Sequence, residues 1–348
     1  MKTKERFVIP IYNIQGMEEF NYQDNLLDIK FEIRMKSYQK SIGDIELANL
    51  FEIKDERTLR EIIDILFHDE ETKLLYDFPL LAVSTLLIID FETDLKEKGK
   101  ILLESILSTF HLIFPFGLGY YRFLLKNLNK VKTITPYVGK VQFVNKNLDI
   151  QIHTSNFKPL FDSPLVQNRV EKNLKKNDFN SFKIIFNAIY NLNVSEKSHY
   201  SRILNQAINY HMLAKTFFNN EQTFVILMIA VEAMFKSSSK LYKDIDKLAK
   251  LLSSDLIQHD KILYKFKQNE NQKEYKKYFI EVRNSIVHGD EYLSETELIE
   301  KLLELYEYVR QSILKILEIN EGRPLNDYYS DLFGEIEKRW NAKITLNH

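Results

Sequence analysis

The segment Phe224–Phe235, with the sequence FVILMIAVEAMF, contains a single charged side chain, that of Glu232. Wound as an α-helix, it is apolar on every side except the one that carries this carboxylate, a pattern typical of a helix buried at the centre of a domain. A carboxylate placed there is costly unless a cation lies beside it. The fold must therefore surround this helix with others, and one of them must bring a cation to Glu232.

The cation that we assign to Glu232 is Arg283, in the segment Arg283–Gly289 (RNSIVHG), which ends a helical pattern that begins near Tyr275. At roughly 100° per residue, four apolar side chains form one arc of this helix: Phe279, Val282, Ile286 and Val287. Arg283 projects from the middle of that arc, where it also needs an opposite charge. We predict that the two helices pack with Glu232 near Arg283.

The AVEAMF helix, the spacer after it and the RNSIVHG segment together resemble the HEPN superfamily, and most closely its Apea-like HEPN domains. The hallmark of that superfamily is an arginine, four to six further residues and a histidine, often with a polar residue directly after the arginine. Arg283, Asn284 and His288 match this hallmark residue by residue. The resemblance covers roughly residues 165–320 and does not extend to the first 150.

The resemblance implies an all-α helical bundle that dimerises and works without a metal or cofactor. Its implied activity is that of an endoribonuclease that leaves a cyclic phosphate, with a composite site shared by the two copies. The usual settings of the family imply a role in anti-phage defence or as a toxin, with RNA as the substrate and a trigger or antitoxin partner at the N-terminal domain.

The residue types suit that chemistry. Histidine titrates near neutral pH, so His288 can serve as a general base or acid. Arg283 presents a planar fork of donors to phosphate oxygens. Asn284 is four residues from His288 and shares its helix face, where it can hold the phosphate or the imidazole tautomer. One histidine cannot comfortably be both base and acid in one displacement, but a two-fold dimer supplies two.

Other interpretations of the same residues stay open. Arg283 and Glu232 can form a buried pair that only stabilises the fold. His288 and Gly289 can form a helix C-cap, since histidine suits the helix dipole and glycine the left-handed turn. The alternative function is a catalytically silent HEPN module that dimerises or binds RNA or protein. A further alternative is a ligand-binding regulator centred on the N-terminal half.

The first 160 residues mix strand and helix patterns, so we predict an α+β domain that senses a trigger or restrains the second domain. Apolar and charged residues alternate over residues 27–35, as in a half-buried strand. The other predicted elements are a strand at Phe7–Tyr12 with Pro10 indicating a sheet edge, helices at Leu59–Phe67 and Lys100–Phe114, a strand or helix at Phe78–Phe91, and a hairpin of Val138–Val144 with Leu148–His153.

Residues 161–348 read almost wholly as helices, which places a boundary near Phe157–Pro164 and predicts a bundle of about five members. Ser294 and Glu297 have the spacing of a capping box. They open a long helix with one apolar face: Leu298, Leu302, Leu305, Val309, Ile313 and Ile316. Aromatic residues after Glu321 predict that the C-terminal tail docks on the bundle.

Composition and motif content limit the ligands and the chemistry that we expect. The net charge is −1, so RNA would need a local basic patch. The lysine-rich stretch Lys261–Lys277 is one candidate, although its acidic residues favour a solvated helix face. There are no cysteines, HExxH motif or Gly-rich phosphate loop, so we expect no metal, disulfide or nucleotide chemistry. We also expect a cytoplasmic protein without membrane contact, because the N-terminus lacks an apolar signal segment.

Overall fold

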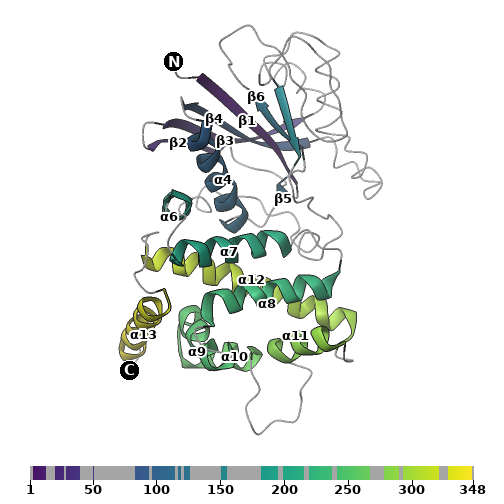
Figure 1. Cartoon of the computed structure of the whole chain (residues 1–348), viewed down its shortest axis with the longest axis vertical. Helices are drawn as coiled ribbons and strands as arrows, with labels where there is room; N and C mark the ends of the chain where they lie inside the picture. Colours follow the sequence, from purple (N-terminus) through teal and green to yellow (C-terminus); the bar gives the residue numbers. More distant parts are fainter. Residues whose placement is uncertain are drawn as a thin grey trace. The chain divides into compact units, whose positions relative to one another are not determined.

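The computed structural model contains two compact units, one built on an antiparallel sheet and one of helices (Figure 1). It describes residues 3–12, 20–26, 29–39, 50, 83–93, 96–113, 117–118, 121–125, 150–154, 182–194, 199–214, 219–236, 241–266, 278–289, 293–320 and 328–346. Helix α4, Lys96–Ile113, is divided between the units: its residues up to Leu103 belong to the sheet unit, and Glu104–Ile113 belong to the helical unit.

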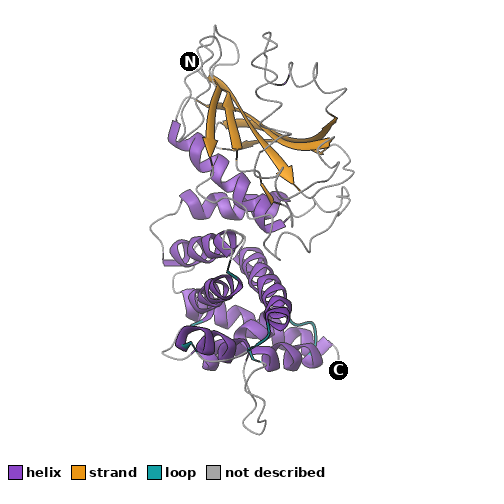
Figure 2. Ribbon diagram, turned by 90° about the vertical axis from the view of Figure 1, so that its right-hand side faces the viewer, coloured by secondary structure: helices purple, strands orange, loops and turns teal. Residues whose placement is uncertain are grey.

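The strands of the first unit form one sheet (Figure 2). Its strand order is β2-β3-β4-β1-β6-β7, with β5 pairing with β1, and neighbouring strands are antiparallel. The strands are β1 Thr3–Tyr12, β2 Phe20–Leu26, β3 Ile29–Gln39, β4 Val83–Thr93, β5 Gly117–Leu118, β6 Tyr121–Leu125 and β7 Ile150–Thr154. The alternation predicted for residues 27–35 is confirmed over β3. Phe31, Ile33 and Met35 are buried, and Lys30 on the other face is exposed.

Strand β4 settles the ambiguity of the run Phe78–Phe91, because the part from Val83 is a strand and residues 78–82 lie outside the described ones. From Leu86 to Phe91 its side chains are buried on both faces, which explains why the run lacks alternation. Asp90 is the polar exception. Arg6 of β1 and Arg34 of β3 hold its carboxylate, with Arg6 Nε 2.6 Å from Oδ1 and Arg34 Nη2 2.7 Å from Oδ2.

The edge position predicted from Pro10 is wrong, because β1 lies between β4 and β6 inside the sheet. On the β6 side, the paired residues of β1 are Arg6–Val8, and β5 pairs with Ile11 and Tyr12. Pro10 falls between these two partners, so among the described strands its missing N–H interrupts no pairing on that side. A break within the sheet tolerates proline as an edge does.

Two further predictions for this half are only partly covered. The second strand of the predicted hairpin is present as β7, and it pairs with β6 in the register Tyr121↔Thr154. Its predicted partner, Val138–Val144, lies outside the described residues, as do the predicted helix Leu59–Phe67 and the predicted domain boundary.

The helical unit packs its helices around one hydrophobic core. Its helices after the shared α4 are α6 Phe182–Val194, α7 His199–Leu213, α8 Asn220–Phe235, α9 Leu241–Leu252, α10 Leu256–Phe266, α11 Phe279–His288, α12 Glu295–Asn320 and α13 Tyr328–Leu346. Helix α8 contacts α7, α9, α11 and α12, which confirms the predicted central helix (Figure 1). The eight described helices after α4 outnumber the five or so expected.

The start and the apolar face of the long helix α12 follow the sequence. Ser294 and Glu297 form the predicted capping box: Ser294 N–H donates to Glu297 Oε2 at 3.0 Å, and Glu297 N–H points to Ser294 Oγ at 3.4 Å. The apolar face of the helix is buried throughout. The tail docks as predicted, because α13 buries Tyr328, Leu332, Ile336 and Trp340. No described helix has the length and apolar character to cross a bilayer.

The part of α4 that belongs to the helical unit is fixed there by three contacts. Asn193 Nδ2 donates to Ser105 Oγ at 2.8 Å, and the rings of Phe110 and Phe182 lie 5.1 Å apart. Arg310 of α12 donates from Nη1 to the carbonyl oxygen of Leu112 at 2.8 Å. These contacts make Glu104–Ile113 an integral part of the bundle.

Candidate functional site

Helix α11 is attached to the core by its first turn. Phe279 and Val282 are buried, and the Phe279 ring meets those of Phe224 and Phe266 at centroid distances of 5.9 and 4.9 Å. The apolar arc is shorter than predicted. Val287 is 52% exposed, so it does not belong to the core contact. Ile286 is partly buried and packs against the core as predicted, so only the end of α11, from Val287 on, is exposed.

Gly289 ends the helix. Its backbone is left-handed, with φ 74° and ψ 23°, and its N–H points to the carbonyl oxygens of Ile286 and Ser285. This geometry confirms the C-cap interpretation, since a side chain at position 289 would be strained. His288 becomes the last helical residue, and its side chain is exposed. An imidazole at this place is accessible to a ligand.

Arg283 and Glu232 lie together as predicted, with 3.8 Å between Arg283 Nη2 and Glu232 Oε1. The expected deep burial is wrong: the side chains are 30% and 24% exposed. The distance exceeds that of a hydrogen bond, so the pair interacts mainly through its charges. An ion pair of this exposure contributes about 0–1 kcal/mol to stability, so its role in the fold is small.

Lys236 is a member of the site that the sequence reasoning missed. Its Nζ lies 3.6 Å from Glu232 Oε2, so each oxygen of the carboxylate faces a different cation. The signal that could have found it is the spacing, because glutamate four residues before lysine on a helix favours this pair. Two cations and one anion leave the cluster with a net charge of about +1.

The guanidinium of Arg283 has donors to spare. Nη1 donates to Asn284 Oδ1 at 3.2 Å, while Nε is buried without a hydrogen-bond partner among the described residues. The structure therefore brings together Glu232, Lys236, Arg283 and Asn284. His288 is further along α11, and the part of the chain that the structure describes shows no contact between His288 and Arg283. One chain alone presents a cluster of net positive charge and a separate exposed histidine.

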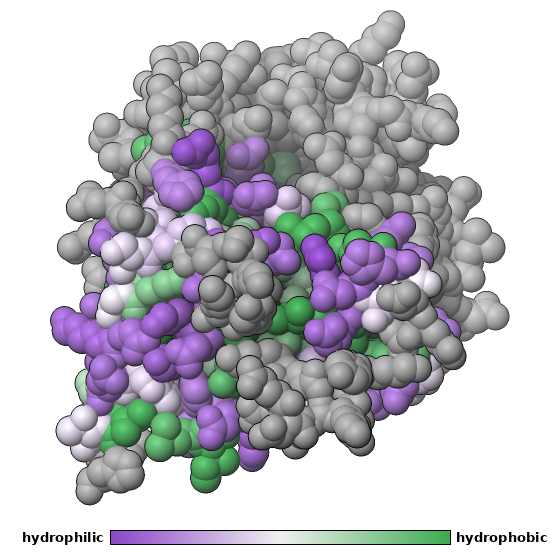
Figure 3. Space-filling model, turned by 60° about the horizontal axis from the view of Figure 1, so that its bottom comes forward, coloured by the Kyte–Doolittle hydropathy of each residue, from purple (hydrophilic) through white to green (hydrophobic). Residues whose placement is uncertain are grey.

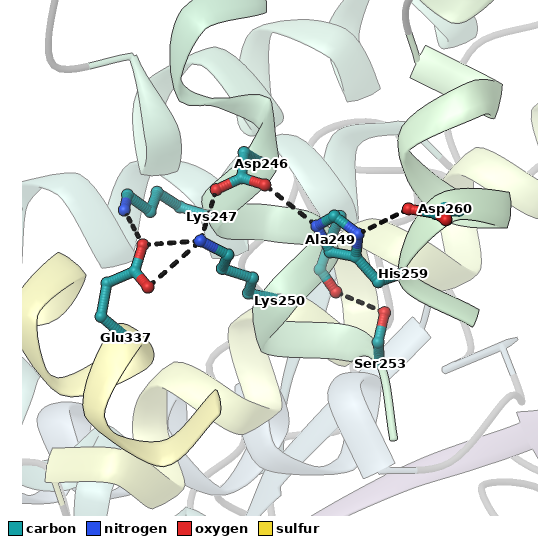
Figure 4. A network of polar contacts seen from close by, with 8 residues as sticks. All are labelled: Asp246, Lys247, Ala249, Lys250, Ser253, His259, Asp260 and Glu337. Carbon is teal, nitrogen blue, oxygen red and sulfur yellow. Dashed lines mark hydrogen bonds and ion pairs between the residues drawn. The ribbon is translucent and has the colours of Figure 1, made fainter. Parts of the chain in front are cut away.

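A second polar cluster joins α9, α10 and α13 (Figure 4). The His259 ring lies between two carboxylates, with Nε2 2.9 Å from Asp246 Oδ1 and Nδ1 3.1 Å from Asp260 Oδ1. Lys250 bonds both Asp246 and Glu337, at 2.9 Å each. His259 is 9% exposed and both ring nitrogens are occupied, so no nitrogen is free for a substrate. The cluster is a structural junction between three helices.

Electrostatics within this junction favour the charged forms. Burial acts to raise the pKa of Asp246, but hydrogen bonds from Lys250 and His259 outweigh it, so the pKa of Asp246 is lowered. Burial likewise opposes the lysine contacts at Glu337, where Lys247 and Lys250 lower the pKa of the carboxyl. The two carboxylates are therefore ionised at neutral pH, and each is paired with a lysine.

The predicted basic stretch Lys261–Lys277 is described only up to Phe266. Here α10 and α12 border an open groove of about 630 Å³. Its charged lining residues are Lys261, Lys265 and Asp260 of α10 and Glu304 of α12. Lys265 pairs with Glu304 at 3.0 Å, so positive and negative charges offset each other. Figure 3 shows polar and apolar side chains interspersed on this end of the helical unit. This supports the solvated-face interpretation.

No protein-family model, no curated protein and no solved structure matches the chain. The resemblance to HEPN domains therefore depends on the residues of the chain itself, namely Glu232 and the Arg283–Gly289 segment.

Proposed function

We propose that this protein is a metal-independent endoribonuclease of the HEPN type, with Arg283, Asn284 and His288 from two copies forming one composite site. The observation that carries the proposal is the state of α11. Its arginine has unused donors beside Asn284, and the helix ends one turn later on an exposed His288 capped by Gly289. Neither residue is engaged as a fully bonded structural group would be.

In the proposed reaction, one His288 accepts the proton of a ribose 2′-hydroxyl as its oxygen attacks the adjacent phosphorus. The bond from phosphorus to the 5′-oxygen breaks, and that oxygen takes a proton from the His288 of a second copy. The products are a 2′,3′-cyclic phosphate and a 5′-hydroxyl end. Arg283 donates to the non-bridging phosphate oxygens, whose negative charge grows at the transition state. Asn284 orients the phosphate.

The geometry of α11 favours a dimer for this reaction. Arg283 and His288 are five residues apart, so their side chains leave the helix in different directions. A two-fold axis beside α11 would place the arginine of one copy near the histidine of the other. It would also supply the two histidines that a base and an acid require. In the proposed defence or toxin setting, the sheet unit would receive a trigger or an antitoxin.

The test is cleavage of RNA in EDTA by the wild type, Arg283→Ala and His288→Ala, with the oligomeric state of each measured in parallel. We expect both substitutions to abolish cleavage in a protein that stays folded and dimeric. His199→Ala is the matched control, because His199 is also exposed but lies on α7. Wild-type protein that leaves RNA intact, even beside extract from infected cells, would contradict the proposal.

The second candidate function is a catalytically silent HEPN module that binds RNA or protein. The observation that favours it is that His288 lies apart from the Arg283 cluster on one chain, so a single copy does not assemble the Arg-x4-His residues into one site. The two candidates separate cleanly, because a silent module binds RNA in EDTA without shortening it.

A further inference from the structure

Glu232 of α8 forms an ion pair with Arg283 of α11 and a second one with Lys236. Lys236 faces Oε2 at 3.6 Å and Arg283 faces Oε1 at 3.8 Å, so the carboxylate is shared and neither cation is bound at hydrogen-bonding distance. The three side chains are 24–36% exposed, which leaves room for a ligand to approach. Lys236 is anchored at the end of α8, where its backbone N–H donates to the carbonyl oxygen of Glu232 at 2.9 Å.

The two cations depend on different parts of the fold. The Glu232–Lys236 pair is local to α8, with glutamate before lysine in the favourable order, so it persists whatever Arg283 does. The Glu232–Arg283 contact is made across two helices, and Arg283 must weaken it to donate to a phosphate. Without Lys236, that movement would leave an unpaired carboxylate beside an incoming anion, and the two negative charges would repel each other.

We propose that Lys236 is a positioning residue, which keeps Glu232 neutralised while Arg283 turns to the phosphate of RNA. This inference rests on the proposed ribonuclease function and adds to it a residue outside the Arg-x4-His motif. Lys236 acts through Glu232 and does not itself contact the substrate. Its contribution is therefore to substrate binding, and the chemical step should be unaffected.

A double-mutant cycle on cleavage of a short RNA in EDTA tests this role. We expect Lys236→Gln to raise KM about fivefold, the upper range for a partly exposed ion pair, with kcat unchanged. In the Glu232→Gln background there is no carboxylate to neutralise, so the same substitution should change KM less than about twofold. Lys236→Arg should keep the wild-type KM, and Lys338→Gln, at an ion-paired lysine on α13, is the control.

Each other outcome overturns the positioning role. A fivefold effect that persists in the Glu232→Gln background would mean that Lys236 contacts RNA directly. An unchanged KM in Lys236→Gln, or a raised KM in Lys236→Arg, would show that its charge does not act on Glu232. If Arg283→Ala abolishes cleavage but the cycle shows no coupling, only this inference fails. If the wild type neither cleaves nor binds RNA, the proposed function fails with it.

Discussion

Asp90 in the sheet unit and Glu232 in the helical unit each lie between two cationic side chains, but the two clusters are built differently. Asp90 is 8% exposed, and Arg6 alone donates to both of its oxygens, at 2.6 and 3.0 Å. The carboxylate of Glu232 is 24% exposed, and its cations stay 3.6 and 3.8 Å away. The two regions use the same charges at different depth and distance.

The difference lies in how fully each cluster binds its cations. At Asp90 one of the two cations is fully bound within the fold, since Arg6 donates to both carboxylate oxygens and from Nη1 to the carbonyl oxygen of Leu50 at 2.7 Å. At Glu232 the cations are positioned but keep free donors, which is what binding an external anion requires. Groups held in place without being satisfied are expected at functional sites, where local structure serves something outside the fold.

The largest expected effect is on Asp90. Asp90→Ala would leave Arg6 and Arg34 facing each other in the sheet without an anion. We expect the free energy of unfolding to fall by about 3–5 kcal/mol, measured by urea denaturation followed by circular dichroism. Glu232→Ala is the matched truncation in the other cluster. Equal losses in the two variants would remove the contrast between the clusters.

Arg283→Ala should give the opposite pattern. We expect RNA cleavage to fall about 100-fold or more, which corresponds to about 2.7 kcal/mol of transition-state stabilisation. Its free energy of unfolding should change by about 1 kcal/mol or less, because the pair is exposed and long. A variant that unfolds instead would assign Arg283 to the fold, and His288→Ala would then carry the test alone.

The carboxylates at the junction of α9, α10 and α13 should stabilise the fold as Asp90 does, but by a smaller free energy. The pKa values of Asp246 and Glu337 are lowered from 3.8 and 4.5. A carboxyl group with a lowered pKa stabilises the fold when the pH is above its pKa in the unfolded state. That contribution is lost as the pH falls through its pKa in the folded state. The thermal unfolding midpoint should therefore decrease as the pH is lowered below about 4.5.

Glu337→Gln isolates that contribution. It should cost about 1 kcal/mol or less at pH 7, and its thermal midpoint should depend less on pH in the acid range than that of the wild type. Identical acid profiles for the two proteins would show that the junction does not respond to pH.

The smallest expected effect is that of Glu232→Gln on stability. Both cations are partly exposed and both ion pairs are long. Removing the charge of Glu232 should therefore change the free energy of unfolding by about 0.5 kcal/mol or less. Differential scanning calorimetry at low and high salt would measure it. A large loss would place Glu232 among the stabilising residues and so weaken the comparison with Asp90.

Local sequence patterns predicted the features that depend on residues close together in the sequence. The apolar α8, the capping box of α12 and the left-handed Gly289 were all readable, because helix burial and capping involve residues within a few positions. The Glu232–Arg283 contact was also predictable, since a charge in an apolar arc demands an opposite one. The exposure of the pair was not, because it depends on how far the neighbouring helices reach.

Sheet topology and multi-helix junctions were out of reach for the same physical reason. Pro10 was misplaced because the gap between β6 and β5 is created by strands more than a hundred residues away. His259 gave no signal, because its partner Asp246 is 13 residues away on another helix and meets it only in the folded bundle. Whether Asn284 and His288 act on RNA stays a prediction.

The division of α4 has a consequence for how the protein is synthesised. Glu104–Ile113 belong to the helical unit, yet they leave the ribosome before β6 and β7 and long before Phe182 and Arg310, to which they attach. The helical unit therefore depends on a segment that is made before the sheet unit is complete, because the segments of the two units alternate along the nascent chain. A gene fragment that starts at residue 161 would also lack the α4 strip of the bundle. It would expose the apolar surface of α6 that Phe110 covers.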